Sequence, residues 1–474
     1  MENSLFFWTI IAYLALLIGV GALRSRQVRS GEDFIVAGRK LSTGVLVGTL
    51  LATWIGSGSI FGSAGLAYDK GLPALWFDAG VWVAIVVLYF VAGRVRRFAQ
   101  FTVPDILEAR YNKYARLLGT LVTVIAYTAI VSYQFRAGGL VLNFVTGIPR
   151  ESGIIITALF VIGYTVLAGM ISVAYTDVVN GIIMTLGLFL TLPFLVHSAG
   201  GLSGIAAALP ASHFQVFGDL PVSEALGYSC ATMLLLLGEA GMYQRFFSAR
   251  DERIARKAVL GWVCGTIVLE TLIVLLAVAG SARFSGINPE MVLLYSVKEA
   301  LPLAVGCLSL AAIVAVIVST ADSFLLVPAT SLARDIYQRF INPRVSPSGL
   351  VRFSRAAVIL LGILAYLQVS FFSRVLEMAI YAYTMYGVGI TPVLLAAFFW
   401  RRANGPGAVS SIAAGMLTTA LWELLGKPFG WPTVYPALGL SLFCLVGVSL
   451  ATRKPDESKW RPFMGQGVVA EIRP

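Results

Sequence analysis

A pair of hydroxyl residues, Ser319 and Thr320, lies inside a long apolar stretch of the chain, residues 302–332. Asp322 and Ser323 follow the pair at once. Polar side chains are costly in hydrocarbon, so those found there usually have a function. On a helix, positions 319, 322 and 323 share one face, which gathers two hydroxyls and a carboxylate. Hard oxygen ligands of this kind suit a hard cation, although the hydroxyls could also bond back to the preceding helical turn.

The composition indicates a membrane protein with many spans. Of the 474 residues, 58% are hydrophobic and only 12% are charged, and the mean hydropathy is +0.83. Apolar stretches of about 17 or more residues, long enough to cross a bilayer, occur thirteen times. They lie near residues 5–22, 42–67, 73–93, 117–146, 153–170, 172–197, 224–243, 258–281, 303–331, 356–373, 376–400, 408–425 and 436–452. The connection from Ala168 to Ala174 is barely polar, so twelve spans are the alternative.

The positive charge of the chain follows the predicted topology. With alternate loops assigned to one side, 28 of the 35 Lys and Arg residues fall on the same side. Because basic loops stay in the cytoplasm, we expect the N-terminus outside and the C-terminus inside, in a plasma or inner membrane. The net charge of +11 therefore reflects topology, and no nucleic-acid partner is expected.

The sequence lacks the residue patterns of several other protein classes. The cysteines have no CxxC spacing, and no Walker-type phosphate loop is present. The two histidines, His197 and His213, lie at or in one external loop. We therefore expect no enzyme, no zinc site and no disulfide framework, with an ion gradient as the source of energy.

Two predicted spans are interrupted by small and polar residues. The second contains Gly56-Ser57-Gly58-Ser59, and the seventh, five spans later, contains Gly238-Glu239-Ala240-Gly241. Broken helices at corresponding positions of two halves indicate an inverted-repeat transporter. We predict an all-α polytopic membrane protein with about thirteen transmembrane helices in a 5+5 inverted repeat. Residues 42–197 would form the first repeat, 224–400 the second, and 401–474 additional helices and a cytoplasmic tail.

Four stretches together resemble the sodium/solute symporter family. They are Ala52-Thr53-Trp54-Ile55-Gly56, the segment Ser172 to Val179, Tyr243-Gln244-Arg245, and Ser319 to Ser323 followed by Arg334-Asp335-Ile336-Tyr337. The resemblance extends from about the first span to Trp400, and its nearest local likeness is to the choline-transporter branch. It implies a leucine-transporter-like fold and sodium-coupled import of a small organic solute by alternating access.

The resemblance also implies a sodium site. In this family, sodium lies between the first broken helix and the helix that carries the Ser-Thr pair. The matching residues here are Ala52 and Ile55, through their carbonyls, and Val316, Ser319 and Thr320, through carbonyl and hydroxyl groups. Na⁺ is accordingly the expected ion.

A second ion site, which some family members contain, would here comprise Asp177, Asp322 and Ser323. The carboxylate of Asp322 departs from the family's hydroxyl pattern. Two other interpretations stay open, since Asp177 could cap its helix and Asp322 could pair with a basic group.

The solute site is expected between the two breaks, where half-helix ends face a cavity. Aromatic rings there could cage a cationic solute, or could serve as packing or interfacial residues. The choline branch has a tryptophan-containing segment before its Gln-Arg pair that is not found here, so choline itself is not implied. The candidate residues are Trp54, Ser57, Tyr133, Gln134, Glu239, Tyr381 and Tyr386.

These observations predict a sodium-coupled symporter whose partners are a small organic solute, a sodium ion and the lipid bilayer. A proton-coupled transporter, with Asp177 or Asp322 titrating, is the first rival. A membrane sensor that binds solute without moving it is the second.

Overall fold

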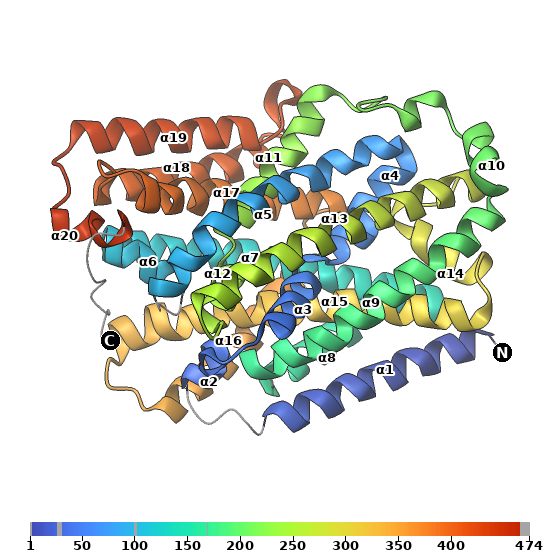
Figure 1. The fold of residues 1–474 in the computed structure, drawn as a ribbon, viewed down its shortest axis with the longest axis horizontal. Coiled ribbons are helices and arrows are strands. Elements are labelled where there is room, and N and C mark those ends of the chain that lie inside the picture. Colours follow the sequence, from blue (N-terminus) through green and yellow to red (C-terminus); the bar gives the residue numbers. More distant parts are fainter. Residues whose placement is uncertain (1, 26–30, 99–101, 168, 465–474) are drawn as a thin grey trace.

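The computed structural model describes residues 2–25, 31–98, 102–167 and 169–464, and these ranges are mainly helical (Figure 1). Within them the strand-like pairing is a single isolated bridge between Leu41 and Ala249. The predicted all-α class is therefore confirmed. Residues 465–474 of the predicted cytoplasmic tail, and Ala168, lie outside the described residues.

The helices of the first part of the chain precede residue 215. They are α1 (Glu2–Ser25), α2 (Gly31–Val36), η1 (Ala37–Arg39), α3 (Thr43–Trp54), η2 (Gly58–Ser63), α4 (Ala64–Lys70), η3 (Leu72–Ala74), α5 (Leu75–Phe98), α6 (Val103–Arg110), α7 (Lys113–Thr146), α8 (Arg150–Leu167), α9 (Met170–Ser198), α10 (Gly201–Ala208) and η4 (Ala211–Phe214).

The remaining helices lie between residues 222 and 464. They are α11 (Val222–Gly238), α12 (Ala240–Ser248), α13 (Glu252–Arg283), η5 (Pro289–Met291), α14 (Val292–Glu299), α15 (Leu303–Ser331), η6 (Leu332–Ile341), α16 (Pro347–Gln368), α17 (Val375–Phe399), α18 (Gly405–Leu424), η7 (Pro428–Gly430), α19 (Val434–Ala451), α20 (Glu457–Trp460) and η8 (Pro462–Met464).

The number of spans is close to the prediction. In the described ranges, 11 helices are long and apolar enough to cross a membrane, and a bent pair formed by α3 and the segment Gly58–Lys70 raises the number to 12. The further predicted span, 408–425, corresponds to the 20-residue helix α18, which packs between α17 and α19 but does not reach the same hydropathy. Because α8 ends at Leu167 and α9 begins at Met170, the fifth and sixth spans are separate helices.

Both predicted helix breaks are present. The axis bends by 49° between α3 and the segment Gly58–Lys70, and Ile55 has extended backbone angles (φ −74°, ψ 101°). The second break is a single extended residue, Glu239 (φ −60°, ψ 112°), between α11 and α12. Each break leaves helix-terminal N–H and C=O groups without intrahelical partners.

Helix α15 lies at the centre of the bundle, packed against α7 and α9 (Figure 1). Every residue from Ser309 to Ser331 is buried, so this helix has no face for lipid along most of its length. Helices at the periphery instead expose large apolar side chains, as expected for surfaces in contact with lipid. Examples are Trp8 on α1, Phe90 on α5, Leu159 on α8 and Phe443 on α19.

A buried charge network joins α6, α7 and η6 at one end of the bundle. Arg116 pairs with Asp105 and Asp335 at 2.6 Å each, and with Glu108 at 2.5 Å. Arg334 and Arg339 add two further positive charges on Asp105 (3.0 Å) and Glu108 (2.8 Å). Burial alone would raise the pKa of Glu108, but the hydrogen bonds from Arg339 and Arg116 outweigh it and hold that pKa below its ordinary value.

Replacement of the central cation should destabilise this network strongly. In an Arg116→Ala variant, Asp105 and Asp335 would remain buried without the guanidinium that now contacts both of them. Breaking a buried pair in this way typically costs about 3–5 kcal/mol. We expect a clear fall in the melting temperature of purified protein in detergent, against little change for Arg344→Ala, an exposed arginine of the same region. Equal melting temperatures of the two variants would contradict the proposed contribution of the network to the stability of the protein.

Candidate functional site

The first helix break and α15 meet through oxygen atoms. Ser319 Oγ donates to the carbonyl of Ala52 at 2.8 Å, and Thr320 Oγ1 lies 3.3 Å from the carbonyls of Thr53 and Ile55. The carbonyls in the last turn of a helix have no intrahelical partner, and the extended residue Ile55 ends α3 here. The hydroxyls of α15 therefore contact carbonyl groups at the end of α3 that lack a partner within that helix.

The structure brings together all five residues of the predicted sodium site. Ala52, Ile55, Val316, Ser319 and Thr320 are each no more than 2% exposed. The alternative that Ser319 bonds back to its own helix accounts only for the longer of its two contacts. Its Oγ lies 3.3 Å from the carbonyl of Val316 but 2.8 Å from that of Ala52. Three carbonyls and two rotatable hydroxyls form an uncharged oxygen set, which fits a monovalent hard cation better than a divalent one.

An arginine occupies the centre of the predicted second ion site. The guanidinium of Arg245, from α12, donates to Ser323 Oγ at 2.8 Å and lies 3.4 Å from Asp177 Oδ2. It also donates to the hydroxyls of Thr49 (2.9 Å) and Thr53 on α3. Thr49 in turn donates to Asp177 at 2.5 Å. One fixed cation therefore links α3, α9, α12 and α15.

The two carboxylates of this cluster outnumber its arginine. Asp177 Oδ1 and Asp322 Oδ2 are both buried and have no hydrogen-bond partner. Asp322 Oδ1 accepts only a long bond, 3.3 Å, from Ser323. Asp177 lies in the second turn of α9, which begins at Met170, so the alternative that it caps its helix is wrong. No ion pair of Asp322 is found within the described ranges.

The second break is held by Glu239 and Tyr386. Both carboxylate oxygens of Glu239 cap α12, since they accept from the backbone N–H groups of Gly241 (2.9 Å) and Met242 (2.6 Å). Tyr127 of α7 donates to the same carboxylate. Tyr386 donates to the carbonyl that precedes Glu239, at 2.8 Å. These contacts give both predicted solute residues a structural role, and their contact with solute stays a prediction.

Four other predicted solute residues lie together at the first break. The backbone N–H of Ser57 donates to Gln134 Oε1 at 3.1 Å, which ties the break to α7. Tyr133, next to Gln134, shares a 3.2 Å hydrogen bond with the hydroxyl of Tyr383, a residue of α17 that sequence reasoning missed. The Tyr383 ring lies 6.3 Å from that of Trp54.

Tyr381 lies away from this group. It lines a cavity of ≈ 570 Å³ between α7, α16, α17 and α18, together with Gln368, Phe372 and Glu423. Its ring packs against Phe372 at 5.2 Å. The structure therefore does not bring Tyr381 together with the residues at the first break.

Two carboxylates beside Trp54 were also missed. Glu270 of α13 accepts from the indole N–H groups of Trp54 (2.8 Å) and Trp82 (2.6 Å). Asp78 of α5 accepts from Ser63 Oγ at 3.0 Å. A signal for both exists in the sequence, since each is an acidic residue inside a predicted span, at 258–281 and 73–93.

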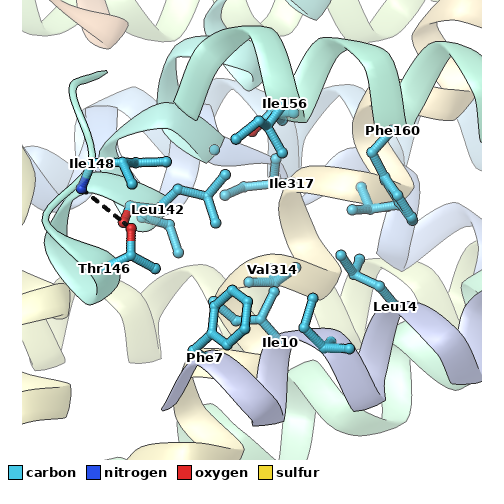
Figure 2. Close-up of a pocket in the computed structure, with 15 residues that line it drawn as sticks. Phe7, Ile10, Leu14, Leu142, Thr146, Ile148, Ile156, Phe160, Val314 and Ile317 are labelled. Carbon is cyan, nitrogen blue, oxygen red and sulfur yellow. Dashed lines mark hydrogen bonds between the residues drawn. The ribbon is translucent and has the colours of Figure 1, made fainter. Parts of the chain in front are cut away.

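An apolar cavity of ≈ 280 Å³ lies among α1, α7, α8 and α15 (Figure 2). From α15 it receives Val314, Ile317 and Val318, three apolar side chains. Nearly all of its lining is hydrocarbon, so it offers no set of polar groups for an ion or a polar solute.

Comparisons with known proteins agree with this geometry. The osmoregulated proline transporter OpuE of Bacillus subtilis is 27% identical, over 98% of this chain and 97% of its own. The sodium/pantothenate symporter of Escherichia coli is 28% identical, over 94% and 97%. Among solved structures, the substrate-bound, outward-open Na⁺-coupled sialic acid symporter has a TM-score of 0.82 at 19% identity and covers 96% of this chain and 99% of its own, which confirms the leucine-transporter-like fold. A model of the sodium:solute symporter family matches residues 34–415, and the chain belongs to that family.

Proposed function

We propose that this chain is a sodium-coupled symporter that imports a small organic solute by alternating access. The observation that supports the proposal is the junction of α3 and α15, where the hydroxyl of Ser319 contacts the carbonyls of Ala52 and Val316 and the hydroxyl of Thr320 contacts that of Ile55. These five residues would bind Na⁺. The family and its sodium-coupled members support sodium as the coupling ion.

The position of this site suggests how coupling works. A sodium ion there would bridge the first broken helix to α15 and hold the break in one arrangement. Trp54 and Ser57, which lie in or next to the same break, would then be fixed for the solute. Release of sodium to the cytoplasm would loosen the bridge, and coupling follows if ion and solute both prefer the outward-open state.

The identity of the solute is proposed only by class. OpuE is named for proline and the Escherichia coli relative for pantothenate, both small organic molecules. None of the relatives described above is named for choline, so the likeness to the choline branch has no support from them. We keep Trp54, Ser57, Tyr133 and Gln134 as proposed solute ligands, a choice supported by the contacts of Ser57 with Gln134 and of Tyr383 with Tyr133 and Trp54.

A second transported cation is supported by the cluster around Arg245. One guanidinium neutralises one of the carboxylates Asp177 and Asp322, and each carboxylate retains an unpartnered buried oxygen. A second Na⁺ at Asp177, Asp322 and Ser323, or a proton on Asp322, would neutralise the other. This observation is what keeps proton coupling as a second candidate function.

The membrane orientation and the two repeats are proposed from the charges of the loops and the order of the spans. The excess of basic residues in alternate loops places the N-terminus outside and the C-terminus in the cytoplasm of the cell membrane. The segments 42–197 and 224–400 would be the two repeats, because each begins with a broken span that is followed by four further spans.

Sodium should stabilise the purified protein more than potassium does at equal ionic strength. At about a hundredfold excess over its dissociation constant, a bound ion adds about 2.7 kcal/mol. We expect this stabilisation in the wild type and its loss in the double variant Ser319→Ala, Thr320→Ala, measured by thermal unfolding. Ser354→Ala is the matched control, since this buried hydroxyl donates to Leu350 of its own helix, far along the chain from the site. Sodium stabilisation that survives in the double variant would refute the site.

A methyl group at Gly56 should weaken sodium binding specifically. A Cβ there would lie 2.9 Å from Thr320 Cγ2 and 3.0 Å from Thr320 Oγ1, which would push the hydroxyl away from the carbonyl of Ile55. We expect Gly56→Ala to raise the sodium concentration for half-maximal stabilisation about tenfold, equivalent to about 1.4 kcal/mol. Gly19→Ala, where a Cβ meets nothing within 4 Å, should leave that concentration unchanged. The same sodium titration for both variants would contradict the assignment.

Uptake of labelled L-proline into proteoliposomes distinguishes the two candidate coupling ions. A sodium gradient should drive accumulation, and a pH gradient without sodium should not. Accumulation driven by the pH gradient alone, and abolished in Asp322→Asn, would instead establish the proton-coupled alternative. If proline is not taken up, the same two gradients are applied to the solute that stabilises the protein in sodium.

A further inference from the structure

Asp78 and Glu270 form a second acidic pair, at the first helix break and away from Arg245. Each residue is only 1% exposed, and their carboxylates are close enough to interact electrostatically. Glu270 accepts an indole N–H on each of its oxygens, from Trp54 and Trp82. Asp78 Oδ1 is buried and has no hydrogen-bond partner.

This pair differs from the other buried carboxylates of the bundle in its charge balance. Asp105, Glu108 and Asp335 contact arginines, and Asp177 contacts Arg245. For Asp78 and Glu270, no ion pair with a basic side chain exists in the part of the chain that the structure describes. Two buried negative charges without a cation are strongly unfavourable, so the pair either holds protons or receives a positive charge from outside the chain.

The surroundings of the pair fit an organic cation. The rings of Trp54 and Phe77 lie 6.3 Å and 6.1 Å from the ring of Tyr383, so three aromatic side chains gather next to the carboxylates. Cation-π attraction to such rings favours an ammonium group.

Two hydroxyls, on α13 and at the first helix break, are buried without a hydrogen-bond partner. Thr266 precedes Glu270 by one turn on α13 and therefore shares its face. Its hydroxyl is fully buried and has no partner, although a buried threonine can bond back to its own helix. The hydroxyl of Ser57, in the break itself, is also buried without a partner. Both groups are available to a polar solute.

We infer that the transported solute carries a protonated amine or quaternary ammonium group, which binds between the Asp78–Glu270 pair and the rings of Trp54 and Tyr383. The inference rests on the proposed transport function and specifies its substrate class. It makes Asp78 and Glu270 the residues that select for charge. Amino acids, betaines and simple organic cations satisfy this requirement, whereas pantothenate, an anion without an amine, does not.

The test uses full-length purified protein in saturating sodium and a panel of solutes of defined charge. Choline, glycine betaine and L-proline carry a positively charged nitrogen, while pantothenate and D-glucose do not. We expect thermal stabilisation by at least one member of the first group and by neither member of the second. Titration of the responding solute then gives its apparent dissociation constant.

Two single variants remove the charge with little change of shape. Glu270→Gln keeps an oxygen acceptor for one of the two tryptophans, and Asp78→Asn keeps one for Ser63. Since each variant removes a charge-assisted contact with the ammonium group, it should weaken binding of the responding solute by about tenfold or more. Glu377→Gln is the matched control, because Glu377 is an exposed carboxylate in the first turn of α17. This variant should bind the solute as the wild type does.

Sodium stabilisation, measured in every variant, shows that the protein is folded and keeps its ion site. Wild-type affinity for the solute in both Glu270→Gln and Asp78→Asn would overturn the inference. So would stabilisation by pantothenate or D-glucose alone, or the lack of a response to all three positively charged solutes in protein that sodium stabilises. If sodium fails to stabilise the wild type, the proposed coupling fails, and the response to the panel without sodium still decides the charge of the solute.

Discussion

The end of α3 in the middle of the bundle is the constraint on which the rest of the structure depends. A helix that stops at Ile55 leaves carbonyl groups without partners in a region where water is scarce. The hydroxyls of Ser319 and Thr320 meet those carbonyls, on a helix that is buried from Ser309 to Ser331. Helices α7 and α9 pack against α15 and keep water and lipid from this junction.

The sequence predicted the parts of the site that are local along the chain. Gly56 and Ser57 mark the first break, and Ser319 and Thr320 stand at helical spacing in an apolar stretch, so both could be recognised one segment at a time. The contact between them could not, because it joins residues about 265 positions apart through tertiary packing. The family resemblance supplied that link. Helix α18 was predicted as a span because its apolar segment is long enough to cross a bilayer, although its small and hydroxyl residues lower its hydropathy.

Arg245 and Glu270 show why the remaining residues were harder to predict. Arg245 lies just beyond the predicted span 224–243, yet it turns inward to reach α3, α9 and α15. Nothing in local spacing distinguishes it from the exposed arginines nearby. Glu270 had a usable signal, an acidic residue within a predicted span, but its significance depends on its neighbour Asp78 and on the lack of a basic partner, which only the fold reveals.

The charges that stay in the protein bear on how voltage acts during transport. Arg245 cannot lose its proton, so its charge cancels that of one carboxylate throughout the cycle. In the proposed cycle, the carboxylates of Asp78, Glu270 and Asp322 are neutralised only while ion, solute or proton is bound. Once these leave, the core of the empty carrier is negative. An inside-negative membrane potential then favours the arrangement in which that core faces outward, so the potential would drive the return of the empty carrier.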